Sequence, residues 1–125
     1  MGTGEYKGGT VTYHSVGDNV SNTAKYYKYE NGYFGDKAKK ESIRHIYSNN
    51  IQSTAKDFYD KITYGGIEAD IPNGKGMVTK MSDGTIVTWR NISSSDGSPA
   101  VDINIKYSKD SGGLKAHKIH FVKGE

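Results

Sequence analysis

The chain has no cysteine and no long apolar run in its 125 residues. The lack of cysteine excludes disulfide bonds and thiolate-ligated metal sites. No apolar stretch approaches the ~20 residues that a membrane-spanning helix requires, and no signal peptide is visible. A domain without cysteine can stay foldable in a reducing cytoplasm, so these absences are compatible with action in the cytosol.

The length and charge favour one small domain with a slight preference for polyanions. A chain of 125 residues matches the commonest domain size and buries roughly two-thirds of its unfolded surface, enough to fold without covalent cross-links. The polar, glycine-rich residues 1–9 are interpreted as the remnant of a linker, and residues 10–125 as a single domain. The net charge of +3 and the pI near 8.9 mildly favour a polyanionic partner.

The first half of the chain carries mostly helical patterns. Residues 10–16 are an exception, because their alternation predicts a short strand. Apolar residues at helical spacing predict a short helix over residues 19–30 and another over residues 36–47.

The clearest helical signal lies in the middle of the chain and predicts a helix over residues 51–62. Asn49, Asn50 or Ser53 can cap its start, and Gly65–Gly66 can end it. Its apolar side chains fall on one continuous stripe: Ile51, Ala55, Phe58, Tyr59 and Ile62.

The second half of the chain alternates as strands do. A hairpin signal, Ser82–Gly84, separates the first two of the four predicted strands. These strands cover residues 77–81, 85–90, 100–107 and 115–123. The sequence therefore predicts an α+β fold, in which N-terminal helices pack on one face of a curled C-terminal antiparallel sheet of about four strands.

Alternation also predicts a polar face on this sheet, because successive side chains point to opposite sides of a strand. His117 shares the apolar row of the last strand, so we expect it to pack in the core. Lys80 can join the polar face, with Val78 beside it. The remaining polar rows carry Arg90, Asp102, Asn104, Lys106, Lys118 and His120. A solvated face without a function is the simpler alternative, since antiparallel sheets often have one.

The polar face has the groups that RNA cleavage without a metal needs. One group must remove the proton of the ribose 2′-OH, another must protonate the leaving 5′ oxygen, and cations must stabilise the phosphorane between them. We predict His120 as base or acid and Arg90 and Lys118 as the cations. Ser94 or Asp102 is predicted to complete or orient the site. Further substrate contacts are predicted at Lys80, Ser93, Ser95, Asn104 and Lys106.

Other chemistries fit the sequence less well. It has no carboxylate cluster for two Mg²⁺ ions and no zinc-ligand spacing, so no cofactor is predicted. Ser93–Ser95 lacks the nucleophile-elbow pattern of acyl transfer, and Gly74–Gly76 lacks the spacing of a phosphate-binding loop. His14 could reach the site only through tertiary folding, and His45, on a predicted helix, is interpreted as structural.

Several short runs together resemble the C-terminal toxin domains of LXG polymorphic toxins. The likeness covers roughly residues 40–123. Its pieces are residues 55–62, 65–68, 74–76, 83–85, 90, 94–99, 102–105 and 118–121. Each piece alone is short, and their combined order carries the resemblance.

The resemblance implies a secreted effector. Such domains are exported by Gram-positive bacteria through type VII secretion, act in the cytoplasm of neighbouring cells and are neutralised by a cognate immunity protein. Several are ribonucleases, and the predicted layout is similar to the barnase–EndoU–colicin–RelE superfold, whose catalytic residues line the sheet face. The implied site comprises Arg90, Ser93–Ser95, Asp102, Lys118 and His120. The paired-histidine pattern of the EndoU branch is absent, so the resemblance does not imply a two-histidine mechanism.

The sequence-based prediction is therefore a monomeric toxin domain with metal-independent endoribonuclease activity, for which tRNA is one candidate substrate. A metal-dependent DNase toxin is the first alternative. The second is a module without catalytic activity, which uses the cationic face to bind nucleic acid or an acidic protein. No membrane span is predicted.

Overall fold

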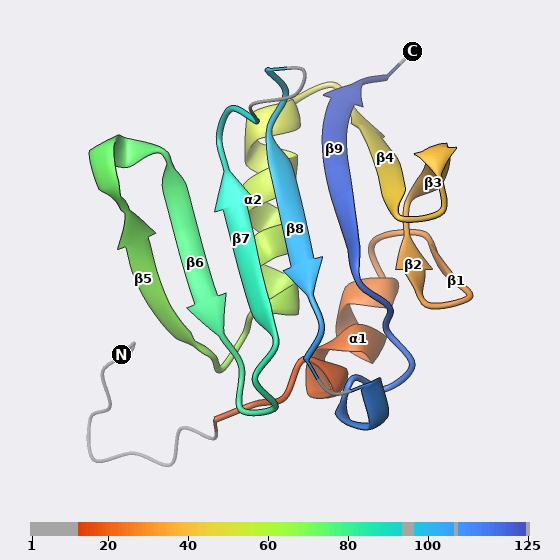
Figure 1. Cartoon of the computed structure of the whole chain (residues 1–125). Coiled ribbons are helices and arrows are strands. Elements are labelled where there is room, and N and C mark those ends of the chain that lie inside the picture. The colour runs from red at the N-terminus through yellow and green to blue at the C-terminus, as the bar shows by residue number, and fades with distance from the viewer. Residues whose placement is uncertain (1–12, 94–96, 107, 125) are drawn as a thin grey trace.

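The computed structural model describes residues 13–93, 97–106 and 108–124. In this part of the chain two α-helices, a seven-stranded sheet and a two-stranded ribbon form an α+β fold (Figure 1). The helices are α1 (Gly17–Ala24) and α2 (Ile51–Ile62), and the ribbon pairs β1 (Tyr29–Glu30) with β2 (Tyr33–Phe34). Short 3₁₀ turns cover Pro72–Gly74 and Ser108–Asp110. None of the described helices is long and apolar enough to cross a membrane.

The main sheet joins strands from both halves of the chain. Its spatial order is β3 (Asp36–Lys40), β4 (Ile43–Ser48), β9 (His117–Lys123), β8 (Ala100–Asn104), β7 (Ile86–Arg90), β6 (Gly76–Lys80) and β5 (Ile67–Ile71). β4 and β9 run parallel, whereas the other neighbouring pairs are antiparallel. A parallel partner cannot be reached by a tight turn. The partner of β4 accordingly lies far along the chain, with Ile43 opposite Lys118 and Ser48 opposite Lys123.

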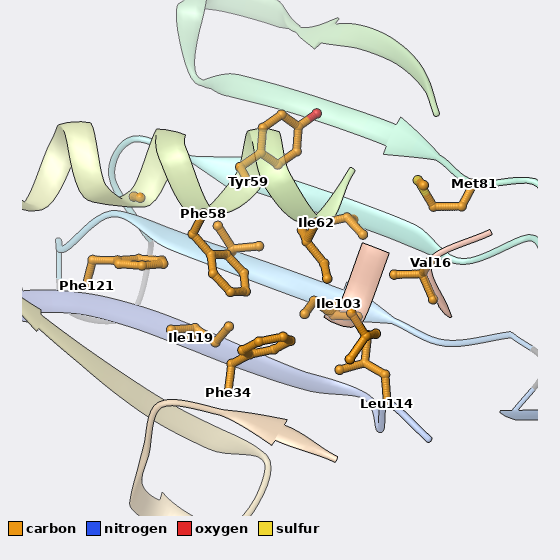
Figure 2. Close-up of a cluster of buried hydrophobic side chains, with 14 residues drawn as sticks. Val16, Phe34, Phe58, Tyr59, Ile62, Met81, Ile103, Leu114, Ile119 and Phe121 are labelled. Atoms are coloured by element: carbon orange, nitrogen blue, oxygen red, sulfur yellow. The ribbon is translucent and has the colours of Figure 1, made fainter. Parts of the chain in front are cut away.

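Helix α2 covers one face of this sheet and leaves the other face without a helix (Figure 1). Four members of its apolar stripe, Ala55, Phe58, Tyr59 and Ile62, are buried as predicted, and Ile51 is partly buried. Phe58 lies at the centre of the stripe (Figure 2). The Phe58 ring contacts Phe34 and Phe121, with ring centroids 5.1 Å and 5.8 Å apart. The predicted polar face therefore exists as a sheet surface opposite α2.

The start of α2 is capped by a side chain that the sequence analysis named. Asn50 Oδ1 accepts a hydrogen bond from the backbone N–H of Ser53 at 3.4 Å. Such a cap satisfies one of the backbone donors that a helix leaves unpaired in its first turn.

We expect Asn50→Ala to lower the free energy of unfolding by about 0.5–1 kcal/mol, the low end for N-caps, because this bond is long and exposed. Urea denaturation should show a lower midpoint with an unchanged slope. Asn49→Ala, at the adjacent exposed position, is the control and should unfold like the wild type. Equal losses in both variants would contradict the cap assignment.

The prediction of a helix over residues 36–47 is wrong, because this segment forms β3 and β4. Its apolar residues Ile43, Ile46 and Tyr47 can lie on one side of a helix, but β-branched and aromatic residues also favour strands. Pairing with β9 selects the strand over the helix, because every residue of β4 from Ile43 to Ser48 is paired with a residue of β9.

Three further element predictions need correction. The helix predicted over residues 19–30 ends at Ala24, and its last two residues form β1. Within the strand predicted over residues 10–16, residues 10–12 lie outside the described residues and residues 13–16 are not in a strand. β5 was not predicted, because its Glu68 and Asp70 disfavour a strand by propensity. The sheet therefore has seven strands, and the prediction of about four is wrong.

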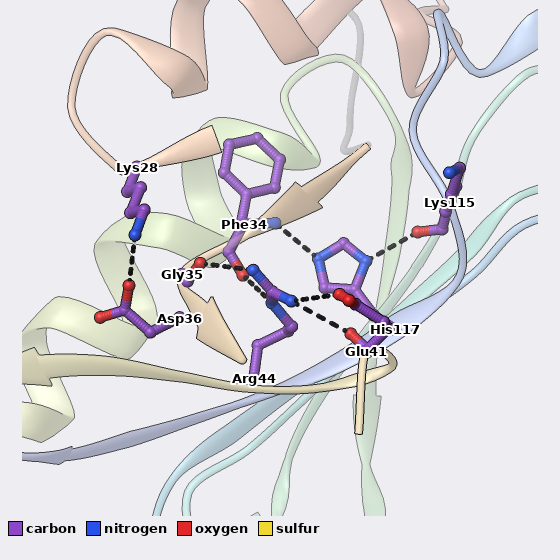
Figure 3. Close-up of polar contacts among 8 residues, drawn as sticks. All are labelled: Lys28, Phe34, Gly35, Asp36, Glu41, Arg44, Lys115 and His117. Atoms are coloured by element: carbon purple, nitrogen blue, oxygen red, sulfur yellow. Dashed lines mark hydrogen bonds and ion pairs between the residues drawn. The ribbon is translucent and has the colours of Figure 1, made fainter. Parts of the chain in front are cut away.

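The prediction that His117 packs in the core is confirmed, since it is only 3% exposed. Its Nε2 accepts a hydrogen bond from the backbone N–H of Phe34 at 3.0 Å, and its Nδ1–H donates to the carbonyl of Lys115 at 2.7 Å (Figure 3). The buried Arg44 guanidinium beside it donates to the carbonyls of Phe34 and Gly35. Burial, together with the charge of Arg44, lowers the pKa of His117 to about 4.

Candidate nucleic-acid-cleaving site

The candidate site lies on the sheet face opposite α2, which we call the open face. Its last strand, β9, directs Lys118, His120 and Val122 to this face, because their neighbours Ile119 and Phe121 are buried under α2. Paired residues on adjacent strands point to the same side of a sheet, so the strand register identifies what surrounds His120.

His120 lies in a row that crosses the sheet. It pairs with Ala100 on β8 and His45 on β4, and Ala100 pairs in turn with Arg90 on β7. Adjacent strands lie about 4.8 Å apart, so the Cα atoms of Arg90 and His120 are separated by about 10 Å. Only the small Ala100 side chain stands between them, which leaves room for the long Arg90 side chain.

The neighbouring row carries charges of both signs. Asp102 on β8 pairs with Lys118 on β9, and Lys118 pairs with Ile43 on β4. Two residues along a strand correspond to about 6.6 Å, so Lys118 is one step from His120 on the same face. The structure thus brings together four of the predicted site residues, Arg90, Asp102, Lys118 and His120, on three adjacent strands.

The central feature of the open face is a pair of histidines. The rings of His45 and His120 have their centroids 6.3 Å apart and are nearly perpendicular, at 89°. The Ser98 hydroxyl lies 3.1 Å from Nδ1 of His120 and shares a hydrogen bond with it, which fixes the orientation of that ring. We refer to His45 and His120 as the histidine pair.

The two members of the pair differ in accessibility. His120 is only 5% exposed, although it lies on the open face. His45 is partly exposed, so a ligand on this face meets His45 more readily.

His45 is not among the predicted site residues, and the structure places it beside His120 on the open face. His45 was interpreted as structural because the segment was assigned to a helix. Strand alternation in β4 could have indicated the position of His45. Arg44 is buried on the α2 side, so its neighbour His45, and Tyr47 two residues further on, point to the open face.

Three predicted substrate contacts lie away from the histidine pair. Lys80, Asn104 and Lys106 line a separate cavity of about 790 Å³ near the β6–β7 hairpin. Asn104 is four residues along β8 from Ala100, which corresponds to about 13 Å. These three residues therefore form a second polar region on the sheet.

The loop between β7 and β8 contains the predicted serines. Ser93 is 2% exposed, and its backbone closes a turn through hydrogen bonds with Ser98 (2.8 Å) and Gly97 (3.1 Å). The substrate contact expected at Ser93 stays a prediction. Ser94 and Ser95 lie outside the described residues. Ser98, which was not predicted as a site residue, is the serine that contacts His120.

Among the described residues, no three His, Asp or Glu side chains gather closely enough to hold a metal ion. No family model, curated protein or solved structure matches this chain.

Proposed function

We propose that this domain is an endoribonuclease that cleaves RNA without a metal ion. The observation that carries the proposal is the juxtaposition of His45 and His120 on a polar sheet face. Cleavage by the 2′-OH needs one group that accepts a proton and one that donates a proton, and imidazole can do both near neutral pH. Two adjacent imidazoles provide both groups.

In this reaction one histidine removes the 2′-OH proton, and the 2′ oxygen forms a bond to phosphorus. The bond between phosphorus and the 5′ oxygen breaks, and the other histidine protonates that oxygen. The products are a 2′,3′-cyclic phosphate and a 5′-OH end. Lys118 and Arg90 stabilise the charge on the phosphorane, because both flank His120 on the open face. The role proposed for Asp102, the cross-strand neighbour of Lys118, is to orient that lysine.

We also propose that the domain is the toxic part of a secreted polymorphic toxin of the LXG type, which acts in the cytoplasm of a target bacterial cell. The sequence resemblance described above supports this proposal. A cognate immunity protein that blocks the site is expected to be acidic and to cover the open face, since electrostatic complementarity favours such pairing.

The test is to incubate the purified domain with total RNA in EDTA and resolve the products on a denaturing gel. We expect discrete fragments that carry 2′,3′-cyclic phosphate ends. A His45→Ala and His120→Gln double variant is the control for contaminating ribonuclease. Intact RNA in the wild-type lane would contradict the proposal. Cleavage of DNA that requires a divalent cation would instead support a DNase toxin.

A second candidate function is nucleic-acid binding without cleavage. The burial of His120, with only 5% of its surface exposed, favours this alternative, because a proton-transfer group must reach its substrate. The two functions are distinguished by the products. A binding module would retain RNA with an affinity that falls steeply with salt and would release no fragments.

A further inference from the structure

The residues next to His45 include an aromatic side chain that the reaction above does not use. Tyr47 lies two residues beyond His45 on β4 and is 54% exposed. Its ring meets the His45 ring edge-on, with centroids 5.9 Å apart at 88°. A large exposed aromatic ring therefore lies directly against the partly exposed histidine of the pair.

The surroundings of Tyr47 keep its ring accessible. β3 pairs with β4 only from Ile43 to His45, so in the part of the chain that the structure describes no strand flanks Tyr47 on that side. On the other side Tyr47 pairs with Val122 of β9, whose side chain adds an apolar surface on the same face. The backbone of Gly124 lies close to Tyr47, since a Cβ added at Gly124 would be 3.0 Å from Cβ of Tyr47.

A cavity of about 520 Å³ lies beside the same stretch of β4, but it opens towards α2. Its lining includes His45 and Tyr47 together with Asp36 of β3 and Thr54 and Asp57 of α2. The open-face surface at Tyr47 is therefore formed by the exposed ring, the His45 ring beside it and Val122.

We propose that Tyr47, supported by Val122, is a stacking platform for an unpaired nucleobase, and that the substrate is single-stranded RNA with a base next to the cleaved phosphate. This inference rests on the proposed function and specifies its substrate. Aromatic side chains bind unpaired bases by stacking, whereas in a duplex the faces of the bases are already covered by their neighbours. Tyr47 and the histidine pair lie on the same face of the sheet, the open face. A base stacked on Tyr47 therefore brings its ribose towards His45.

The platform is tested by binding, so that its outcome is independent of cleavage. The probe is a single-stranded oligonucleotide with 2′-O-methyl riboses, which lack the attacking hydroxyl, and one 2-aminopurine, whose fluorescence falls when it stacks. Tyr47→Ala should weaken binding about 5- to 150-fold, the range for loss of one stacked base, and should abolish the quenching. Tyr47→Phe keeps the ring and should bind within about twofold of the wild type.

Tyr64 provides a matched control. It is 68% exposed and also meets a histidine edge-on, His14, at 5.2 Å, but it follows α2 rather than facing the histidine pair. Tyr64→Ala should leave binding unchanged, and Tyr47→Ala should not alter binding of a duplex of the same sequence. Unchanged single-strand binding in Tyr47→Ala, or an equal loss in Tyr64→Ala, would overturn the inference.

The same assay separates failure of the platform from failure of the proposed function. If the wild type binds the probe through Tyr47 but leaves unmodified RNA intact, the stacking platform stands and the ribonuclease proposal fails. If unmodified RNA is cleaved but Tyr47→Ala binds the probe as the wild type does, the ribonuclease stands and the platform fails.

Discussion

Replacement of either member of the histidine pair is expected to slow RNA cleavage by about 10²- to 10⁴-fold, the usual contribution of a positioned acid or base. His45→Ala removes the partly exposed member, and His120→Gln removes the imidazole while keeping a polar side chain in the buried site. Cleavage rates under single-turnover conditions measure the loss directly. Circular dichroism and urea unfolding establish that the variants remain folded.

The double variant gives a sharper test of the pair. Residues that act as one catalytic unit are strongly non-additive, so His45→Ala with His120→Gln should be little slower than either single variant. Two residues that act independently would instead multiply their losses. A bell-shaped dependence of the rate on pH is expected for the wild type, and each single variant should lose one limb of it.

His14→Ala is the control for loss of a histidine as such, because His14 bonds to Asn19 and contacts Tyr64, away from the open face. It should cleave like the wild type. If His45→Ala retains full activity while His120→Gln loses it, the site has one catalytic histidine and the role given to His45 is wrong. If His120→Gln is fully active, the proposed mechanism as a whole fails.

The second large effect concerns acid stability and the buried His117. Its Nε2 accepts a hydrogen bond in the folded protein, and burial lowers its pKa to about 4 from an ordinary value of 6.5. In the unfolded chain this histidine takes up a proton at higher pH than in the folded one. The unfolded state therefore binds more protons in this interval, and stability falls as pH falls.

The pH window follows from these two values. The contribution of His117 is fully present above about pH 6.5 and is lost progressively down to about pH 4. A shift of this size corresponds to about 3 kcal/mol of unfolding free energy. Urea unfolding at a series of pH values between 7 and 4 measures the loss.

His117→Gln is the comparison variant, because the glutamine carbonyl can accept the hydrogen bond from Phe34 but does not titrate. It should be less stable than the wild type at neutral pH, where it lacks the ring packing and the bond to Lys115, and its stability should change much less between pH 6.5 and 4.5. A variant that loses stability as steeply as the wild type would show that other groups control the acid transition.

Local patterns determined a large part of this structure. The apolar stripe and the Asn50 cap both lie within α2, and the Ser82–Gly84 turn lies between strands adjacent in sequence. Helical and hairpin contacts join residues close along the chain, so a short window contains the information that specifies them. The same holds for the buried position of His117, which follows from strand alternation alone.

The tertiary structure alone decided which side chains meet at the candidate site. Ile43, Ile46 and Tyr47 fit one side of a helix, and their segment becomes a strand because it pairs in parallel with β9 near the other end of the chain. That pairing places His45 beside His120. The sequence by itself therefore determined α2, the hairpin and the polar rows of the last strands, whereas the fold decided that the open face also carries His45 and Tyr47. The physical reason is that local propensity cannot distinguish two conformations of similar energy, and only the long-range hydrogen bonds of the sheet select one of them.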